Sequence, residues 1–290
     1  MRGTIHLVPS EDAGWLLPLF EPTIEKWSRR RLEQLGLPGA KHEKALAAIR
    51  RALEAEGPIT RPEAADRVAA AGVELNSQTR FHISLLAVSS GIACLGPDRG
   101  RMPCLILRRD WLGELPRFDR ETALGELARR YLGAFGPATD RDFAAWSGLG
   151  LREVRAGLES IAGEIVEVRV GGLPMLALAD RRRRTQRSGQ VRLLGAFDTY
   201  VLGYANRDFA VPHRHRAALK AGGGGWIRPL IVRDGEVIGG WRYARRKGGV
   251  EVAIDSTASL PAEVRRAVER EVADIARFEA VEATLAEGAN

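Results

Sequence analysis

The fold is decided by a stretch that reads NSQTRFHISLLAVSSG at residues 76–91. These letters predict a helix that Asn76 or Ser77 caps and that Gly91 ends. The helix has an apolar side, marked at spacings of three and four by Phe81, Leu85 and Val88, with Leu86 next to it. On or near the other side lie the polar residues Gln78, Arg80, His82 and Ser84.

A hairpin follows this helix, because residues 92–107 read IACL, then GPDRGRMP, then CLIL. Two apolar runs joined by Gly, Pro and Asp predict two strands and a turn with a basic tip. A donor-rich helix followed by such a hairpin is typical of a winged helix on DNA, with the helix in the major groove and the tip on phosphate. We therefore predict that DNA contacts come from Ser77, Gln78 and Arg80 and phosphate contacts from Arg99 and Arg101. His82 contacts a base or packs under the helix, and packing is favoured.

The residues before this stretch complete one winged-helix unit. Residues 44–55 predict a helix, and Gly57-Pro58-Ile59-Thr60 ends it. Thr60 and Glu63 have the spacing of a capping box, which opens a short helix that reaches residue 71. We predict a winged-helix domain over residues 41–115.

The same plan repeats once. A helix over residues 121–135 is followed by Gly136-Pro137-Ala138-Thr139, which matches the earlier junction, and by a short helix over residues 143–146. A helix over residues 151–162 and strands over residues 164–170 and 173–178 complete the pattern. The sequence thus predicts a second winged helix over residues 116–180, in which phosphate contacts come from Arg152 and Arg155.

The two ends of the chain differ from these units. Residues 4–7 alternate like a strand, Ser10 opens a helix that Pro18 bends or ends, and residues 23–35 predict another helix, so residues 1–40 resemble a remnant of a first winged helix. Residues 190–290 predict a β-rich domain with strands over 191–194, 226–232, 236–243 and 250–254 and a closing helix over 261–285. The predicted class is α+β, with tandem winged helices and a small C-terminal β-barrel-like domain.

A basic stretch, a glycine run and several aspartates in the C-terminal half of the chain allow a structural or a functional interpretation. Residues 180–189 are a solvated basic loop or a phosphate-contacting arm, with equal weight, and the glycines at 222–225 form a loop. Asp198, Asp208 and Asp234 are candidates for acid–base chemistry. The plain interpretation makes Asp234 a turn residue and pairs Asp198 with an arginine such as Arg207.

Composition narrows the function classes. The chain has 290 residues and a formal net charge of +7, which fits a partner with phosphates, although 39 of its 44 basic residues are Arg and an Arg-rich coding bias explains part of this charge. Cys94 and Cys104 form no disulfide framework or metal cluster. They lie on the two predicted hairpin strands, where they either face each other or are reduced and buried, and the second interpretation is favoured. His213 and His215 lack further ligands at metal spacing. We predict a cytoplasmic, nucleoid-associated monomer with no cofactor and no membrane contact.

Four segments carry a resemblance to one family. They read RGTIHLV at 2–8, RRYLGAFGPATDRDFAAWSGL at 129–149, LLGAFDTYVLGYANRD at 193–208 and GGWIRPLIVRDGEVIGGWR at 224–242. These segments resemble the bacterial winged helix DNA-binding domain proteins that include the AlkZ- and YcaQ-type DNA glycosylases. The resemblance covers essentially the whole chain. It implies three tandem winged helices and a β-barrel-like domain around a basic channel, and an activity that excises bulky alkylated bases or unhooks interstrand crosslinks in duplex DNA.

The sequence departs from this family at the catalytic motif. The family places a Gln-x-Gln or Gln-x-Asp pair upstream of Arg-Gly-Thr-x-His, and neither pair occurs in the 290 residues. The resemblance therefore implies a start site assigned too late or a truncated, inactive relative, and we assign no catalytic residue. Residues expected near the active-site channel are Arg2, His6, Asp198, Tyr204 and Arg207.

Two other classes of protein fit the winged-helix pattern. A non-enzymatic transcription regulator is the main alternative, and it would protect one sequence strongly, usually as a dimer. A protein-interaction module built on winged helices would show no salt-dependent DNA binding. A glycosylase relative instead prefers damaged or distorted duplex and depends little on sequence.

Overall fold

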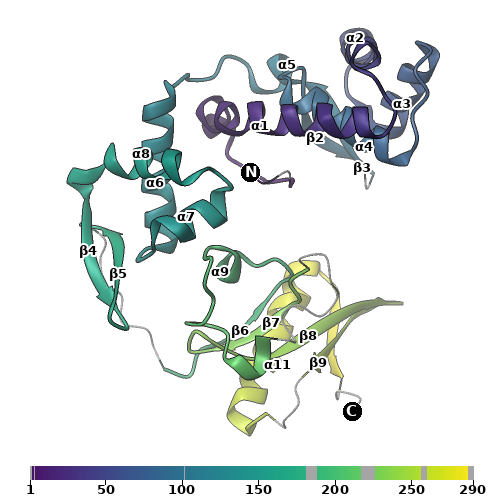
Figure 1. Ribbon diagram of the computed structural model, residues 1–290. Coiled ribbons are helices and arrows are strands. Elements are labelled where there is room, and N and C mark those ends of the chain that lie inside the picture. The colour runs from purple at the N-terminus through teal and green to yellow at the C-terminus, as the bar shows by residue number, and fades with distance from the viewer. Residues whose placement is uncertain are drawn as a thin grey trace. The chain divides into compact units, whose positions relative to one another are not determined.

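The computed structural model describes residues 2, 4–100, 102–180, 188–216, 226–255 and 260–286. The chain forms two compact units (Figure 1). Unit 1 comprises Met1–Arg130 and Ser147–Ala162, and unit 2 comprises Tyr131–Trp146 and Gly163–Asn290. The predicted domain over residues 116–180 therefore contributes to both units.

Unit 1 begins with helices and then forms a small sheet. Its elements are η1 (Ser10–Asp12), α1 (Ala13–Gln34), α2 (Gly39–Glu56), β1 (Ile59–Thr60), α3 (Arg61–Ala70), α4 (Ser77–Ser89), β2 (Ala93–Arg99), β3 (Met102–Leu107) and α5 (Arg108–Leu112). The antiparallel strands have the order β1-β3-β2, so the two-residue strand before α3 pairs with the hairpin after α4. The helix order and the hairpin agree with the sequence prediction for this segment.

The helix ends of unit 1 follow from local chemistry. Thr60 and Glu63 form a capping box that opens α3, and Asn76 and Thr79 form another that opens α4. After α4 the chain turns at Gly91, whose φ of 79° is a backbone conformation that favours glycine. The Thr60–Glu63 capping box and the turn at Gly91 were predicted from the sequence, and Asn76 is the one of the two candidate caps that α4 uses.

The hydrophobic core of unit 1 lies between α1, α2, α4 and the sheet. Its most completely buried members include Leu32, Ile49, Val68, Ile83, Leu86 and Leu105. The predicted apolar side of α4 is wrong, because Phe81 is exposed and Leu85 and Val88 are only half-buried, whereas His82, Ile83 and Ser84 are buried. Both sides of α4 carry apolar residues, so spacing alone did not identify the side that packs.

The N-terminal prediction needs two corrections. Residues 4–9 form no strand, and α1 is one helix of 22 residues that contains both Pro18 and Pro22. Each proline removes one backbone hydrogen bond, but burial of Trp15, Leu19 and Leu32 along the same helix offsets that loss.

Three further helices and a hairpin connect the N-terminal and C-terminal parts of the chain. They are α6 (Arg120–Phe135), α7 (Asp140–Ser147), α8 (Leu151–Glu159) and the antiparallel strands β4 (Ile165–Val170) and β5 (Leu173–Leu178). A 3-10 turn, η2 (Ala162–Glu164), precedes β4. The turn between these strands is Gly171-Gly172, as the sequence predicted, and both glycines have positive φ.

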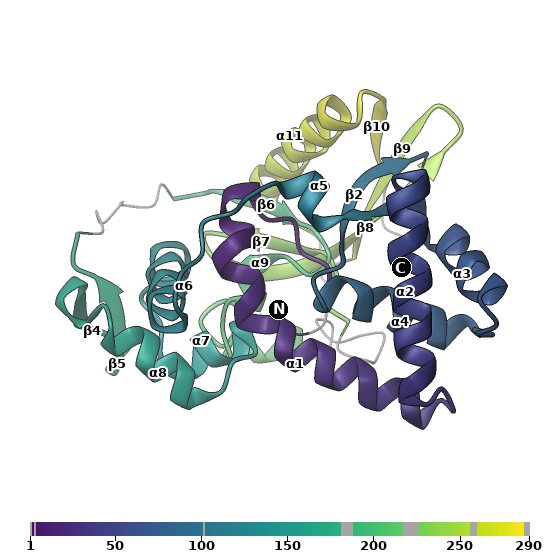
Figure 2. The same cartoon turned by 90° about the horizontal axis from the view of Figure 1, so that it is seen from above.

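The C-terminal part of unit 2 is an open sheet covered by one helix. Its elements are β6 (Val191–Leu194), α9 (Thr199–Leu202), η3 (His213–His215), β7 (Leu230–Arg233), β8 (Glu236–Arg246), β9 (Gly249–Asp255), α11 (Ala262–Glu279) and β10 (Glu282–Ala286). The strand order is β10-β9-β8-β7-β6, so β10 and β6 form opposite edges of the described sheet. Helix α11 packs Val264, Val268 and Val272 against the sheet (Figure 2).

The closing helix of unit 2 ends earlier than predicted. Ala280 adopts a left-handed conformation, and residues 282–286 then pair in parallel with β9. The expected α+β class is confirmed, and the sheet is an open half-barrel.

Candidate nucleic-acid interface

The N-terminal end of α4 presents the first predicted DNA contacts. The capping box fixes this end, because Asn76 Oδ1 accepts from the backbone N–H of Thr79 at 2.9 Å. Ser77, Gln78 and Arg80 are all exposed there. Gln78 Oε1 also accepts a hydrogen bond from Arg31 on α1 at 3.4 Å. The structure thus brings these three predicted side chains to one accessible helix end, and their DNA contacts stay a prediction.

The tip of the β2–β3 hairpin places Arg99 against α3. Arg99 Nη1 lies 2.8 Å from Glu63 Oε1, and Nη2 donates to the carbonyl of Pro58 at 2.6 Å. Hydrogen bonds from Thr60, and then the Arg99 guanidinium, hold the pKa of Glu63 below its ordinary value. Arg99 must exchange this carboxylate for phosphate if it contacts DNA. The other predicted tip residue, Arg101, lies outside the described residues.

The Arg99–Glu63 pair makes a direct prediction about affinity. We expect Glu63→Gln to tighten binding to duplex DNA by about threefold to tenfold, because glutamine keeps the capping box while Arg99 loses its charged competitor. The measurement is the dissociation constant from fluorescence anisotropy at fixed salt. Glu56→Gln is the matched control, because it removes the same charge from an exposed pair with Arg67. An equal gain in both variants would mean that only net charge matters.

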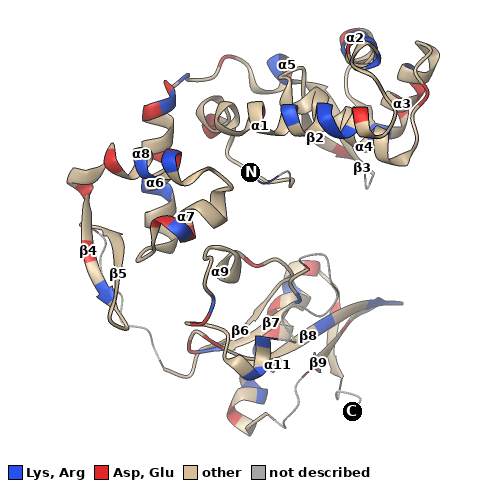
Figure 3. Ribbon diagram, viewed as in Figure 1, with Lys and Arg blue, Asp and Glu red and all other residues tan. Residues whose placement is uncertain are grey.

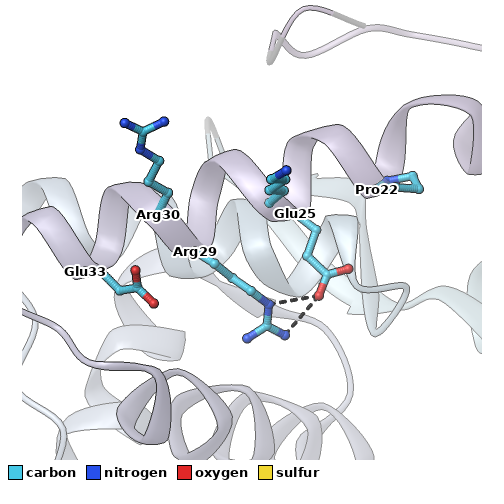
Figure 4. Close-up of a pocket in the computed structure, with 6 residues that line it drawn as sticks. Pro22, Glu25, Arg29, Arg30 and Glu33 are labelled. Atoms are coloured by element: carbon cyan, nitrogen blue, oxygen red, sulfur yellow. Dashed lines mark hydrogen bonds and ion pairs between the residues drawn. The ribbon is translucent and has the colours of Figure 1, made fainter.

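Helix α1 carries a basic face that the sequence reasoning missed. A hollow of about 480 Å³ is lined by Pro22, Glu25, Lys26, Arg29, Arg30 and Glu33, which all lie on this helix (Figure 4). Arg29 is neutralised by Glu25 at 2.9 Å and Glu43 at 2.7 Å. Among the described residues Lys26 and Arg30 form no ion pair. Figure 3 shows basic residues along α1. The sequence feature that indicates this face is the spacing of three and four positions between charged residues over residues 22–33.

Other predicted contacts in unit 1 are exposed but lie on other elements. Arg152 and Arg155 are exposed on α8. Arg2 lies close to Gly148, and His6 Nε2 lies 2.8 Å from Thr4 Oγ1 in the segment before α1. Their predicted roles on DNA or near a channel stay untested.

The three predicted channel residues of unit 2 have structural partners. Asp198 caps α9 by accepting from the backbone N–H of Tyr200 at 2.8 Å. The hydroxyl of Tyr204 donates to the carbonyl of Phe135 at 2.7 Å, and Arg207 Nε donates to the carbonyl of Val201 at 2.7 Å. Asp198 therefore serves as a helix cap, a role that the proposed pairing with Arg207 did not include. These bonds order one loop, and a role in a channel stays a prediction.

A second basic hairpin tip, also missed, lies between β8 and β9. Arg246 pairs with Gly249 across a turn of Lys247 and Gly248, and Arg245 precedes it. Arg245 and Arg246 are held by Glu279 at 2.6 Å and Glu251 at 3.1 Å. The signal in the sequence was the Lys247-Gly248 pair between the predicted strands over residues 236–243 and 250–254.

Within the part of the chain that the structure describes, the cysteines and histidines are not gathered as metal ligands. Cys94 pairs across the ladder with Ile106 and Cys104 with Thr60, so the two do not face each other, and both are free thiols. Burial raises the pKa of the Cys94 thiol. Over the described ranges no group of three or more His, Cys, Asp or Glu side chains is arranged to hold a metal ion. Within the same ranges, every helix is too short or too polar to cross a membrane.

Comparisons with known proteins agree on one family. Residues 1–278 match the family described as DNA glycosylase AlkZ-like. The chain is 30% identical to the interstrand DNA cross-link repair glycosylase of Streptomyces sahachiroi over 302 residues, which cover 97% of this chain and 78% of that protein. The solved structure of Streptomyces sahachiroi DNA glycosylase AlkZ has a TM-score of 0.75 and 27% identity, covering 99% of this chain and 80% of the other. The resemblance found in the sequence is thereby confirmed, and the chain belongs to the AlkZ-like DNA glycosylase family.

Proposed function

We propose that this protein binds duplex DNA that carries bulky alkylated bases or interstrand crosslinks and acts in the repair of that damage. The observation that carries the proposal is the accessible N-terminal end of α4, held next to a hairpin in a helix, strand, helix, helix, hairpin order. That order is the plan of a winged helix, whose third helix enters the major groove. The similarity to the Streptomyces cross-link repair glycosylase supports the lesion class.

The domain assignment is part of this proposal. Residues 41–115 act as one winged helix, residues 116–180 as a second, and residues 190–290 as a barrel-like domain. The capping pair Thr139 and Asp142 supports the second unit, because it repeats the pair that opens α3. The expected monomer and nucleoid association belong to the same proposal.

The proposed reaction sets a requirement that this chain's residues must meet. Removal of a base needs a polar group that positions a water against the sugar C1′ and stabilises positive charge on the sugar. Among the described residues we assign none to this step. Asp198 and Arg207 already bond within their own loop, and Tyr204 bonds to the carbonyl of Phe135 on α6. Binding is therefore the part of the function that the side chains support most directly.

The two described arginines of the proposed interface, Arg80 on α4 and Arg99 at the hairpin tip, predict a change in salt dependence. We expect Arg80→Ala with Arg99→Ala to weaken binding to all duplex sequences and to lower the slope of log affinity against log salt by about two, one for each lost contact. The measurement is a salt titration of binding by fluorescence anisotropy. The double variant Arg67→Ala with Arg277→Ala removes two exposed, ion-paired arginines elsewhere and should leave the slope unchanged. An unchanged slope in the first variant would remove both residues from the interface.

The function itself is tested by comparing damaged and undamaged duplexes of one sequence. We measure binding to both and follow base release from duplex carrying an alkylated purine. Preference for the alkylated duplex supports the proposal, and base release adds catalysis to it. Strong protection of one sequence without any preference for damage would instead support a transcription regulator.

A further inference from the structure

Two large aromatic side chains are left exposed beside one buried histidine. Trp27 on α1 is 47% exposed and Phe81 on α4 is 42% exposed. Both rings contact the imidazole of His82 edge-on, with centroid separations of 5.0 Å for Trp27 and 5.1 Å for Phe81. Two large exposed rings that share one contact form an apolar patch, and grouped apolar surface is a feature of interaction sites.

His82 supplies a polar atom without a partner at this place. The side chain is only 7% exposed, and its Nδ1 is buried without a hydrogen-bond partner. A buried polar atom in this state costs free energy until a donor or acceptor reaches it. Burial, and then the charge of Arg31, lowers the pKa of His82, so the imidazole is neutral near pH 7. The ligand that suits this cluster combines an aromatic face with hydrogen-bonding edge groups.

The charges around the cluster favour a nucleic acid over an apolar peptide. Arg31 on α1 donates to Gln78 on α4, and Trp27 on α1 contacts His82 on α4, so the two helices run antiparallel here. This arrangement places hydrogen-bond donors beside both rings. Arg80 is exposed next to Phe81. Lys26 and Arg30, also exposed, lie one position before and three positions after Trp27 in the sequence. An unpaired nucleobase joins a flat π-face, hydrogen-bonding edges and an adjacent phosphate.

We propose that Trp27 and Phe81 form a stacking site for an unpaired base of distorted duplex DNA, with His82 and Gln78 at its edge and Arg80 on the neighbouring phosphate. This rests on the proposed function and names the feature of the substrate that unit 1 senses. Base stacking on an aromatic side chain contributes enough for alanine substitution to change affinity by roughly fivefold to a hundredfold per base. It does not depend on sequence, because every base has a π-face.

The experiment compares a fully paired duplex with the same duplex carrying one bulged 2-aminopurine. The natural protein should bind the bulged duplex about tenfold more tightly and quench the 2-aminopurine fluorescence, as stacking does. Trp27→Ala and Phe81→Ala should each remove most of that preference and restore the fluorescence, with affinity for paired duplex within about twofold of the natural protein. Trp27→Phe should keep part of both signals because it keeps a ring.

Controls separate this inference from the proposed function. Trp111→Ala removes another tryptophan, 50% exposed on α5, and should change neither signal. Failure of the natural protein to bind either duplex would overturn the proposed function. Equal affinity of the natural protein for both duplexes would overturn the stacking site alone. A dimer of the natural protein in sedimentation that Trp27→Ala dissociates would also overturn it, because a second copy would then cover the rings.

Discussion

Asp142→Ala is expected to lower the free energy of unfolding by about 3–5 kcal/mol, measured by urea denaturation followed through tryptophan fluorescence. Asp142 is only 6% exposed. Its carboxylate accepts from the backbone N–H and hydroxyl of Thr139 at 2.9 Å and 2.6 Å, and from the backbone N–H of Ala205 at 2.9 Å. Alanine leaves these donors without an acceptor, and buried donors in that state are costly.

Two other variants test this explanation. Asp142→Asn keeps one acceptor oxygen and should give an intermediate loss. Asp119→Ala removes an exposed carboxylate that caps α6 through Thr122 and should cost much less, because water replaces the lost bonds. Equal losses for the buried and the exposed aspartate would show that burial of Asp142 contributes nothing, and our account would be wrong.

Gly203→Ala is expected to cost about 3 kcal/mol, through overpacking rather than a cavity. A Cβ at this position would lie 2.4 Å from Phe135 Cδ1 and 2.7 Å from Cε1. The Phe135 ring cannot move away easily, because it packs against Tyr131, Trp146 and Tyr204. The carbonyl of Gly203 also accepts from the buried hydroxyl of Tyr131 at 2.7 Å, so a backbone shift would weaken that bond.

Gly195→Ala is the matched control for this prediction. Gly195 lies in the same unit, and a Cβ there would meet no atom within 4 Å. The measurement is the shift of the midpoint and slope in urea denaturation of both variants. The control should match the natural protein or exceed its stability slightly, since alanine restricts the unfolded chain. A stable Gly203→Ala variant would mean that the aromatic cluster is loosely packed.

The sequence was most informative where short-range chemistry decides the structure. Thr60 with Glu63, Asn76 with the helix after it, and the Gly171-Gly172 turn were all predictable, because a cap or turn depends on residues within a few positions. The strands around them followed from apolar runs. The packing side of α4 was not predictable, since His82 is buried and Phe81 exposed only because α1 lies against that helix.

The candidate interface divides along the same line. The exposure of Ser77, Gln78 and Arg80 could be predicted from the sequence, because a capped helix end is exposed by its local geometry. The pairing of Arg99 with Glu63 joins residues 36 positions apart, and the contact of Trp27 with His82 joins two helices. Long-range contacts of this kind depend on how the core packs, so local sequence patterns do not predict them. The Arg99–Glu63 pair and the exposed rings of Trp27 and Phe81 could therefore be identified only from the three-dimensional structure.

The positions of the two thiols have a practical consequence. Cys104 is buried and Cys94 is half-buried with a raised pKa, so both react slowly with maleimides near pH 7. Because neither faces the other across the ladder, oxidation does not readily join them within the chain. A single cysteine introduced at an exposed place such as Ser77 would thus take a dye or spin label selectively in the otherwise natural sequence. Spectroscopy of unit 1 on DNA can begin without first removing the native cysteines.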